Sequence, residues 1–297
     1  MTNDWGHEAA FIDLRHLGSA VRPVSGFHPL TVLSGLARNE KLQLTYVVPL
    51  RPSTEFVRAL RPEIERDERG VGVRLTVREG LAGACQDDVG VLLDRLRMHA
   101  DDIDLFLDAG VVDEAPGRLI EVTNRLGRMN QWRSLTVVGG SFPKDLQRLR
   151  RGSNVLPRTE WENWQTLLRG GIVNAPRFGD FTIQWAHYEE PPEGANPSAS
   201  IRYTTRNGFL VMRGEALRAP DGGSRYHQYP ANAQLLFERP EFCGEGFSFG
   251  DRYIWEVATG CIEGTGNAMT WLRAGINHHM TLVVRQLRDI LPSDPNV

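Results

Sequence analysis

The chain has 297 residues, of which 41% are hydrophobic and 24% are charged, values typical of a globular protein with a substantial core. Its 34 basic and 37 acidic side chains give a formal net charge of −3, which disfavours nucleic-acid binding driven by bulk positive charge. The composition also excludes a collagen, a coiled coil, a disordered chain and a disulfide scaffold.

The cysteines and the N-terminus predict a cytoplasmic protein. Cys85, Cys243 and Cys261 are odd in number and widely spaced, with no C-x-x-C motif, which fits a reduced environment. The N-terminus lacks the basic start and the apolar stretch of a signal peptide. No apolar run is long enough to cross a membrane. We therefore expect a cytoplasmic location and no membrane contact.

Short apolar runs alternate with amphipathic stretches over residues 1–190. This alternation predicts β/α units that build a parallel sheet, and Ser53 is the expected N-cap of the second helix. The predicted strands are Ala9–Leu14, Leu42–Pro49, Val71–Val77, Ile103–Asp108, Ser134–Gly139 and Phe181–Trp185. The predicted helices are Leu30–Arg38, Thr54–Arg66, Asp87–His99, Arg118–Met129 and Thr159–Arg169.

Six strands of this kind fit either an open doubly wound sheet or most of a (β/α)8 barrel. No G-x-G-x-x-G motif follows the first strand, and the chain contains no P-loop motif, which argues against an open sheet that binds a dinucleotide or a nucleoside triphosphate. We therefore predict an α/β fold that resembles a partial TIM barrel. In such a fold the functional side chains lie at the C-terminal ends of the strands.

Two carboxylates at these strand ends are candidate catalytic groups. Asp13 and Asp108 belong to the first and fourth predicted strands, and they would serve as a general acid and base, or hold a divalent ion with water, if the fold brought them together. Asp108 could equally cap the loop that follows it. Arg74 and Gln184, on two other predicted strands, are candidate ligand-binding residues.

After residue 190 the pattern changes to a hairpin followed by helices, and we expect residues 191–297 to pack on the same domain. Asn207-Gly208 separates the strand-like runs Ile201–Arg206 and Phe209–Gly214. An Asn-Gly pair between two such runs is a strong hairpin signal, because both turn residues favour positive φ. The helices predicted after the hairpin are Ala231–Arg239, Asp251–Ala258, Ala268–Arg273 and Asn277–Ile290.

The predicted hairpin places two arginines opposite each other. With Asn207-Gly208 as the loop, Arg202 pairs directly with Arg213. Facing cations repel, so one interpretation is a forked site for a phosphate or a carboxylate. In the alternative, Asp180, Asp251 or a glutamate neutralises the pair, or both side chains point into solvent.

The densest group of polar and aromatic residues lies near the C-terminus. Adjacent side chains on a helix diverge by roughly 100°, so His278 and His279 are not expected to share a metal ion, and no H-x-x-x-H motif is present. In one interpretation, one of these histidines faces the interior as an acid–base or hydrogen-bonding group and the other is exposed. We favour the alternative, in which they are structural histidines whose hydrogen bonds are satisfied within the fold. We predict neither a metal nor a cofactor. The remaining candidate ligand-binding residues are Tyr203, Asp251, Arg252, Trp271, Asn277 and His279.

Several segments resemble the Beta protein family of T-even bacteriophages and bacteria. Where members of the family usually have Gln-His-Pro, this chain has Gln184-Trp185-Ala186. The resemblance implies a role in phage biology or bacterial conflict more than it implies a reaction. The segments that carry it are Phe178–Gln184, Ile201–Thr204, Phe209–Gly214, Phe247–Tyr253 and Gly266–His279, with Trp132–Thr136, Ser141–Pro143 and Leu156–Trp161 upstream.

Proteins of this family begin with two further strand segments, so that Ala9–Leu14 resembles their third strand. The resemblance therefore implies that the opening β/α units are missing and that Ala9–Leu14 is the edge of an incomplete barrel. An unpaired apolar edge is a liability. We expect a partner chain, a homo-oligomer contact or an N-terminal arm to cover it.

Two classes of function remain open. In the first, the protein is a non-catalytic component, for instance of phage defence, that binds a phosphate, a nucleotide, a nucleic acid or a protein through Arg202, Arg213 and the C-terminal cluster. In the second, it is a hydrolase-type barrel enzyme for a phosphorylated or nucleic-acid substrate, with Asp13, Asp108 or His278 as the acid–base group and the arginines clamping the anion. We expect the first.

Overall fold

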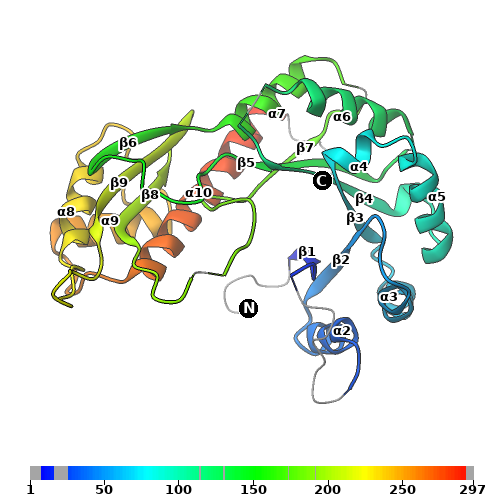
Figure 1. Cartoon of the computed structure of the whole chain (residues 1–297), viewed down its shortest axis with the longest axis horizontal. Helices are drawn as coiled ribbons and strands as arrows, with labels where there is room; N and C mark the ends of the chain where they lie inside the picture. Colours follow the sequence, from blue (N-terminus) through cyan, green and yellow to red (C-terminus); the bar gives the residue numbers. More distant parts are fainter. Residues whose placement is uncertain are drawn as a thin grey trace. The chain divides into compact units, whose positions relative to one another are not determined.

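The computed structural model describes residues 8–16, 26–113, 115–129, 131–172, 174–190 and 192–291. The chain divides into two compact units that are interleaved along the sequence (Figure 1). Unit 1 is formed by Met1–Gly110, Glu114–Gly139 and Glu162–Gly179, and unit 2 by Val111–Asp113, Gly140–Trp161 and Asp180–Val297.

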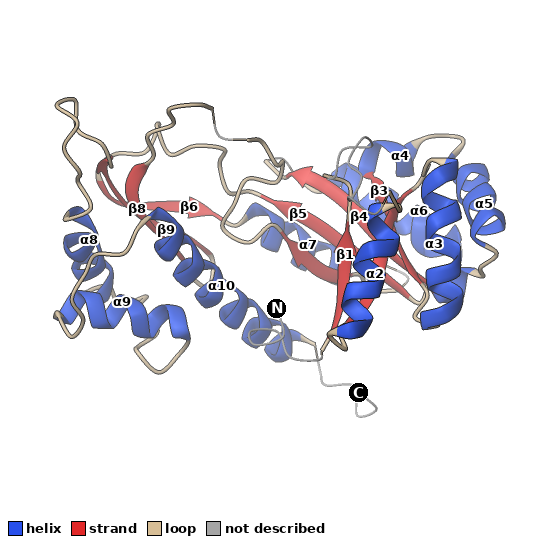
Figure 2. Cartoon of the chain, turned by 90° about the horizontal axis from the view of Figure 1, so that it is seen from below, coloured by secondary structure: helices blue, strands red, loops and turns tan. Residues whose placement is uncertain are grey.

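A six-stranded sheet in the order β1-β2-β3-β4-β5-β7 is the framework of unit 1. Strands β1 to β4 pair in parallel, and the sheet curls into half a barrel (Figure 2). The described residues therefore confirm the α/β class, but they do not form a closed barrel. The strands are β1 (Ala9–Asp13), β2 (Gln43–Pro49), β3 (Val71–Thr76), β4 (Ile103–Val111), β5 (Ser134–Gly140) and β7 (Arg177–Asp180).

The helices of unit 1 cover one face of this sheet because alternate strand residues point toward them. Val48, Val73 and Leu105 are fully or almost fully buried in one core cluster with helix residues such as Leu60 and Leu92. The Ser53 side chain accepts a hydrogen bond from the Phe56 backbone, which confirms the predicted N-cap. The helices are α2 (Pro29–Asn39), α3 (Thr54–Asp67), α4 (Val77–Leu81), α5 (Cys85–Leu96), the short 3-10 helix η1 (Ala100–Asp102), α6 (Gly117–Met129) and α7 (Thr159–Arg169).

A three-stranded antiparallel sheet in the order β6-β9-β8 is the framework of unit 2. One core cluster joins Tyr203 and Met212 of the sheet to Leu236 and Trp271 of the helices. The strands are β6 (Gly152–Pro157), β8 (Ser198–Thr204) and β9 (Gly208–Ala216), and the helices are α8 (Gln228–Phe237), α9 (Phe249–Thr259) and α10 (Ala268–Ile290).

The structure differs from the predicted elements in several places. The predicted strand Phe181–Trp185 is wrong: β7 ends at Asp180, whose carboxylate accepts a hydrogen bond from the Thr182 backbone and turns the chain. Strand β6 was not predicted. The two predicted helices at the C-terminus are a single helix, α10, which runs without a break through Gly275.

The predicted register of the hairpin is also wrong. Thr204 pairs with Phe209, so Arg202 lies opposite Val211 and Arg213 lies opposite Ser200. The two-residue turn is therefore 206–207 rather than 207–208. Moving the turn by one residue shifts the cross-strand partner of every hairpin residue by two positions along the chain. None of the three residues 206–208 has a positive φ, so the geometry that an Asn-Gly tip favours is not used here.

Candidate functional site

A cavity of about 400 Å³ lies beside the hairpin of unit 2. Arg202 of β8 and Arg213 of β9 both line it. Arg202 pairs with Val211, and Ser200 pairs with Arg213. On each strand these positions are two residues apart, so the side chains of Arg202 and Arg213 point to the same face of the sheet. The other lining residues are Lys144, Asp145, Leu146, Gln147, Asn196, Pro197, Ser198, Ser200, Ala216, Tyr229, Ala268, Met269, Trp271 and Leu272.

Arg202 is a half-buried cation with no carboxylate partner among the described residues. Its Nη1 donates a hydrogen bond to the Ile183 carbonyl at 2.8 Å, and its guanidinium carbon lies 4.7 Å from the centre of the Phe142 ring. Burial lowers the pKa of Arg202 to about 10, against a small opposing influence of Tyr229. The side chain is therefore held in place by a neutral carbonyl and a ring, while its charge is left uncompensated.

Arg213 and Tyr229, which line the same cavity, each have a buried donor atom that makes no hydrogen bond within the described part of the chain. The Nε of Arg213 and the hydroxyl of Tyr229 are buried, and neither has a hydrogen-bond partner among the described residues. Burial raises the pKa of Tyr229 to about 12, so its hydroxyl keeps its proton and remains a donor near neutral pH. Buried donors without acceptors are rare in folded proteins, so the Arg213 Nε and the Tyr229 hydroxyl both require an explanation.

The other charged residues of the cavity are exposed. Lys144 forms an ion pair with Glu189 at 2.5 Å. Asp145 uses its carboxylate to accept a hydrogen bond from the Gln147 backbone. Neither one forms an ion pair with Arg202 or Arg213 in the part of the chain that the structure describes, so the two arginines supply the uncompensated charge.

The carboxylates that were expected to neutralise the arginines are occupied elsewhere. Asp251 Oδ2 is 2.8 Å from His278 Nδ1, and its Oδ1 accepts a hydrogen bond from the Tyr203 hydroxyl at 2.7 Å. Asp180 Oδ2 is 2.8 Å from His279 Nε2. Although burial by itself would raise the pKa of Asp180, the hydrogen bond and the charge of His279 lower it.

His278 and His279 are both buried, so the interpretation in which one of them is exposed is wrong. The reason lies in Thr204, which serves both rings: its carbonyl accepts from His278 Nε2 and its hydroxyl is 2.8 Å from His279 Nδ1. The two rings thus diverge along α10, as the helix geometry predicts, but each one meets its own carboxylate. Within unit 2 the network ties α10 to β8, to Asp180 and to the start of α9.

Four more of the predicted ligand-binding residues have separate roles or positions. The Asn277 side chain accepts a hydrogen bond from the Gly250 backbone at 3.0 Å, next to the network. Trp271 is buried against the Tyr229 ring, with the two rings 5.1 Å apart and nearly parallel. Arg252 is exposed and pairs with Glu256 one turn later. Gln184 is exposed.

In unit 1 the candidate residues of the half-barrel converge. Arg74 of β3 donates to Asp13 Oδ2 at 2.9 Å, and its Nε and Nη2 donate to Asp108 Oδ2 at 3.0 and 2.8 Å. Arg15 also reaches Asp108 Oδ2, at 3.1 Å, and Asp108 Oδ1 accepts from the Gly110 backbone. Both carboxylates are thus engaged by arginines, which leaves neither one a free general base in this arrangement.

Sequence reasoning missed a second buried charge in unit 2. Arg158 is fully buried, and its Nε lies 3.6 Å from the buried carboxylate of Glu160, which also accepts a hydrogen bond from Ser141. Burial lowers the pKa of Arg158 and raises the pKa of Glu160. The two residues are only two positions apart at the start of α7, and the sequence alone does not reveal that both are buried.

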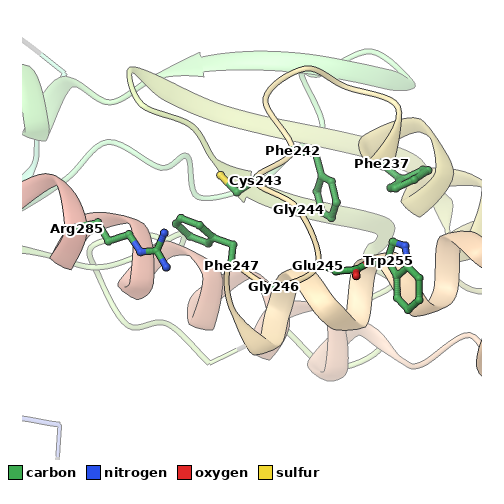
Figure 3. A pocket seen from close by; sticks show the side chains of 9 residues that line it. All are labelled: Phe237, Phe242, Cys243, Gly244, Glu245, Gly246, Phe247, Trp255 and Arg285. Atoms are coloured by element: carbon green, nitrogen blue, oxygen red, sulfur yellow. The ribbon is translucent and has the colours of Figure 1, made fainter.

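Figure 3 shows a second cavity in unit 2, of about 640 Å³, lined mainly by rings and by loop backbone. The guanidinium carbon of Arg285 lies 4.2 Å from the centre of the Phe247 ring. The Cys243 backbone N–H in its wall donates to the Tyr203 hydroxyl at 2.8 Å. This cavity therefore lies against the Asp251–His278 network, but the side chains of that network are buried behind its wall.

The described residues hold no cluster of three or more histidine, cysteine, aspartate or glutamate side chains that suits a metal ion. Across the same residues, no helix has the length and the apolar character required to span a membrane.

Fold and site together define a class: a mixed α/β protein with a half-barrel unit and a second unit that carries a cationic cavity. The chain belongs to the Beta protein family, which matches residues 1–285 and so covers nearly the whole sequence. None of the curated proteins and none of the solved structures compared with the chain matches it.

Proposed function

We propose that this protein is a non-catalytic binding protein and that unit 2 holds an anionic ligand, a phosphate, a nucleotide or a nucleic acid, in the cavity beside the hairpin. One observation carries the proposal: Arg202 and Arg213 line the same cavity, and neither has an ion-pair partner among the described residues. The phage or bacterial-defence context that the family resemblance implies stays a prediction.

The physical argument is the cost of an uncompensated charge. Taking a guanidinium partly out of water costs free energy unless an anion or hydrogen-bond acceptors replace the lost hydration. The lowered pKa of Arg202 expresses this cost. An oxyanion in the cavity would supply several acceptors at once, and hydrogen bonds between charged groups are roughly twice as strong as neutral ones.

The geometry of unit 1 supports the binding protein over the barrel enzyme. An acid–base pair needs one carboxylate that is free to take a proton from the substrate or from water. Asp13 and Asp108 are instead both held by Arg74. His278, the third candidate, is fully buried and uses both ring nitrogens in hydrogen bonds within the fold.

The proposal is tested by calorimetric titration of the whole protein with inorganic phosphate, a mononucleotide and a short oligonucleotide. We expect at least one of them to bind, and Arg202→Gln and Arg213→Gln each to weaken its binding by about tenfold to a hundredfold, the effect of losing charged hydrogen bonds. Thermal melting with each anion gives a second readout, because a ligand stabilises the folded state that it binds.

Arg206→Gln is the matched control for these variants. Arg206 belongs to the same hairpin, is exposed and does not line the cavity, so the variant should bind as the unmodified protein does. The proposal is wrong if no anion binds, or if all three arginine variants lose affinity equally, which would indicate only a general loss of positive charge.

A further inference from the structure

We infer that the ligand of this cavity is a compact dianion of the phosphate-monoester type, and that the Tyr229 hydroxyl is its third donor beside Arg202 and Arg213. The inference rests on the proposed function, because it names the chemistry of the anion that the same cavity binds. This inference excludes a nucleic acid bound through its phosphodiester backbone, and it excludes recognition of a nucleotide base in the cavity.

The first step is the unpaired hydroxyl of Tyr229. The residue is fully buried, lines the cavity, and its hydroxyl has no hydrogen-bond partner among the described residues. Such a group destabilises the fold for as long as it stays unsatisfied. Because the hydroxyl keeps its proton, an oxyanion oxygen is the partner that suits it. It also lies close enough to Arg202 for each to influence the other's ionisation.

The second step is the charge of the ligand. Two uncompensated guanidinium groups match two negative charges. A phosphate monoester carries between one and a half and two negative charges near pH 7, since its second pKa is about 6, whereas each diester group of a nucleic acid carries one. The net charge of −3 opposes a long polyanion.

The third step concerns the aromatic rings of the cavity. Sequence-tolerant binding of nucleotides uses ring faces that are free to stack on a base. Tyr229 and Trp271 are instead stacked on each other, 5.1 Å apart, and they are 0% and 1% exposed. Neither ring offers a free face, so recognition is expected to end at the phosphoryl group.

Calorimetry with methyl phosphate and dimethyl phosphate tests the class of ligand. These probes differ by one methyl group and by one negative charge near neutral pH. We expect methyl phosphate to bind at least about tenfold more tightly, an effect of about 1.4 kcal/mol, and its affinity to rise as the pH increases through about 6, where the second proton of the phosphate is lost. Adenosine 5′-monophosphate should bind within about threefold of methyl phosphate, because its base adds no stacking.

Tyr229→Phe tests the third donor. We expect this variant to bind methyl phosphate about tenfold more weakly, as the loss of one hydrogen bond to a charged group predicts. Without ligand it should melt at the same or a higher temperature, because it removes a buried polar group that had no partner. Tyr226→Phe is the control. Tyr226 is partly exposed and lies outside the cavity, so the affinity for methyl phosphate and the melting temperature without ligand should both be unchanged.

The outcomes separate the two proposals. If no anion binds in a way that depends on Arg202, the proposed function and this inference both fail. If an anion binds through Arg202 but dimethyl phosphate or an oligonucleotide binds as tightly as methyl phosphate, or Tyr229→Phe keeps full affinity, the proposed function stands and this inference is wrong.

Discussion

At the scale of single residues, unit 2 contains two kinds of buried polar group, which differ in whether their hydrogen bonds are made within the fold. Asp251, His278 and His279 are buried with their hydrogen bonds made inside the fold. Arg213 and Tyr229 keep buried donor atoms without partners. The first kind stabilises the fold, and the second kind is where a ligand can contribute binding energy.

Asp251→Asn should destabilise the protein by about 3 kcal/mol, because breaking a buried charged network leaves its other members unpaired. The carboxylate accepts hydrogen bonds from Tyr203, Ser248 and His278 together, and an amide has only one oxygen to accept them. Urea unfolding followed by circular dichroism measures the effect.

Arg252→Ala, at the next position, is the control for this variant. Arg252 is exposed and forms only a surface pair with Glu256, so its unfolding free energy should change by less than about 0.5 kcal/mol. Equal unfolding midpoints for Asp251→Asn and the unmodified protein would show that the network contributes little to stability.

The candidate site was predictable only in part, and the reason lies in single side chains. Arg202 and Arg213 could be identified as candidates because the alternation of a hairpin places them on one face. Tyr229 could not, since a hydroxyl is known to lack a partner only when every neighbouring group is placed. Two adjacent histidines on a helix suggested one inside and one outside, but Thr204 accommodates both rings.

At the scale of elements, the five longer helices of unit 1 were predicted well because amphipathic spacing and caps are local signals, whereas the short helices α4 and η1 were not predicted. The predicted helix Thr159–Arg169 coincides with α7. Strand β6 was missed because its Asn-Val-Leu-Pro run is short and half exposed. Its place is decided by pairing with β9. Gly208, expected to provide a positive φ, instead gives room to β6: a Cβ there would lie 2.7 Å from the Leu156 carbonyl oxygen.

Gly275→Ala should destabilise the protein even though alanine favours a helix. A Cβ at this position would lie 2.5 Å from the Arg202 carbonyl oxygen and 2.6 Å from Ile183 Cδ1. Helix α10 would therefore have to move away from β8, which we expect to cost at least about 1–3 kcal/mol, as overpacking does. Thermal and urea unfolding measure the change.

Gly90→Ala is the matched control, because a Cβ on Gly90 in α5 would meet no atom within 4 Å. This variant should gain about 0.5–1 kcal/mol, the ordinary helical preference for alanine over glycine. If Gly275→Ala gained stability as well, the close approach of α10 to β8 would not limit the packing of unit 2.

At the scale of the whole molecule, β1 is an edge of the half-barrel sheet, as the family resemblance implied. Among the described residues it pairs only with β2, and Phe11 is 47% exposed. A partner chain, a second copy or an N-terminal arm that covers this edge stays a prediction. The parallel β/α character of the sheet could be predicted from alternation, whereas the division of the chain into interleaved units depends on long-range pairing that no local pattern encodes.

The interleaving leads to a prediction for truncated chains: residues 1–190 alone should not fold as they do in the whole protein. Strand β6 pairs with β9 from Gly152 to Pro157, and Phe142 and Ile183 share a buried cluster with Phe209 of the same strand. Removing residues 191–297 therefore leaves an unpaired strand and an exposed apolar cluster, both of which promote aggregation. Co-expression with residues 191–297 as a separate chain should restore a soluble complex, measured by size-exclusion chromatography. A monomeric 1–190 fragment that unfolds cooperatively would contradict this dependence of β6 on β9.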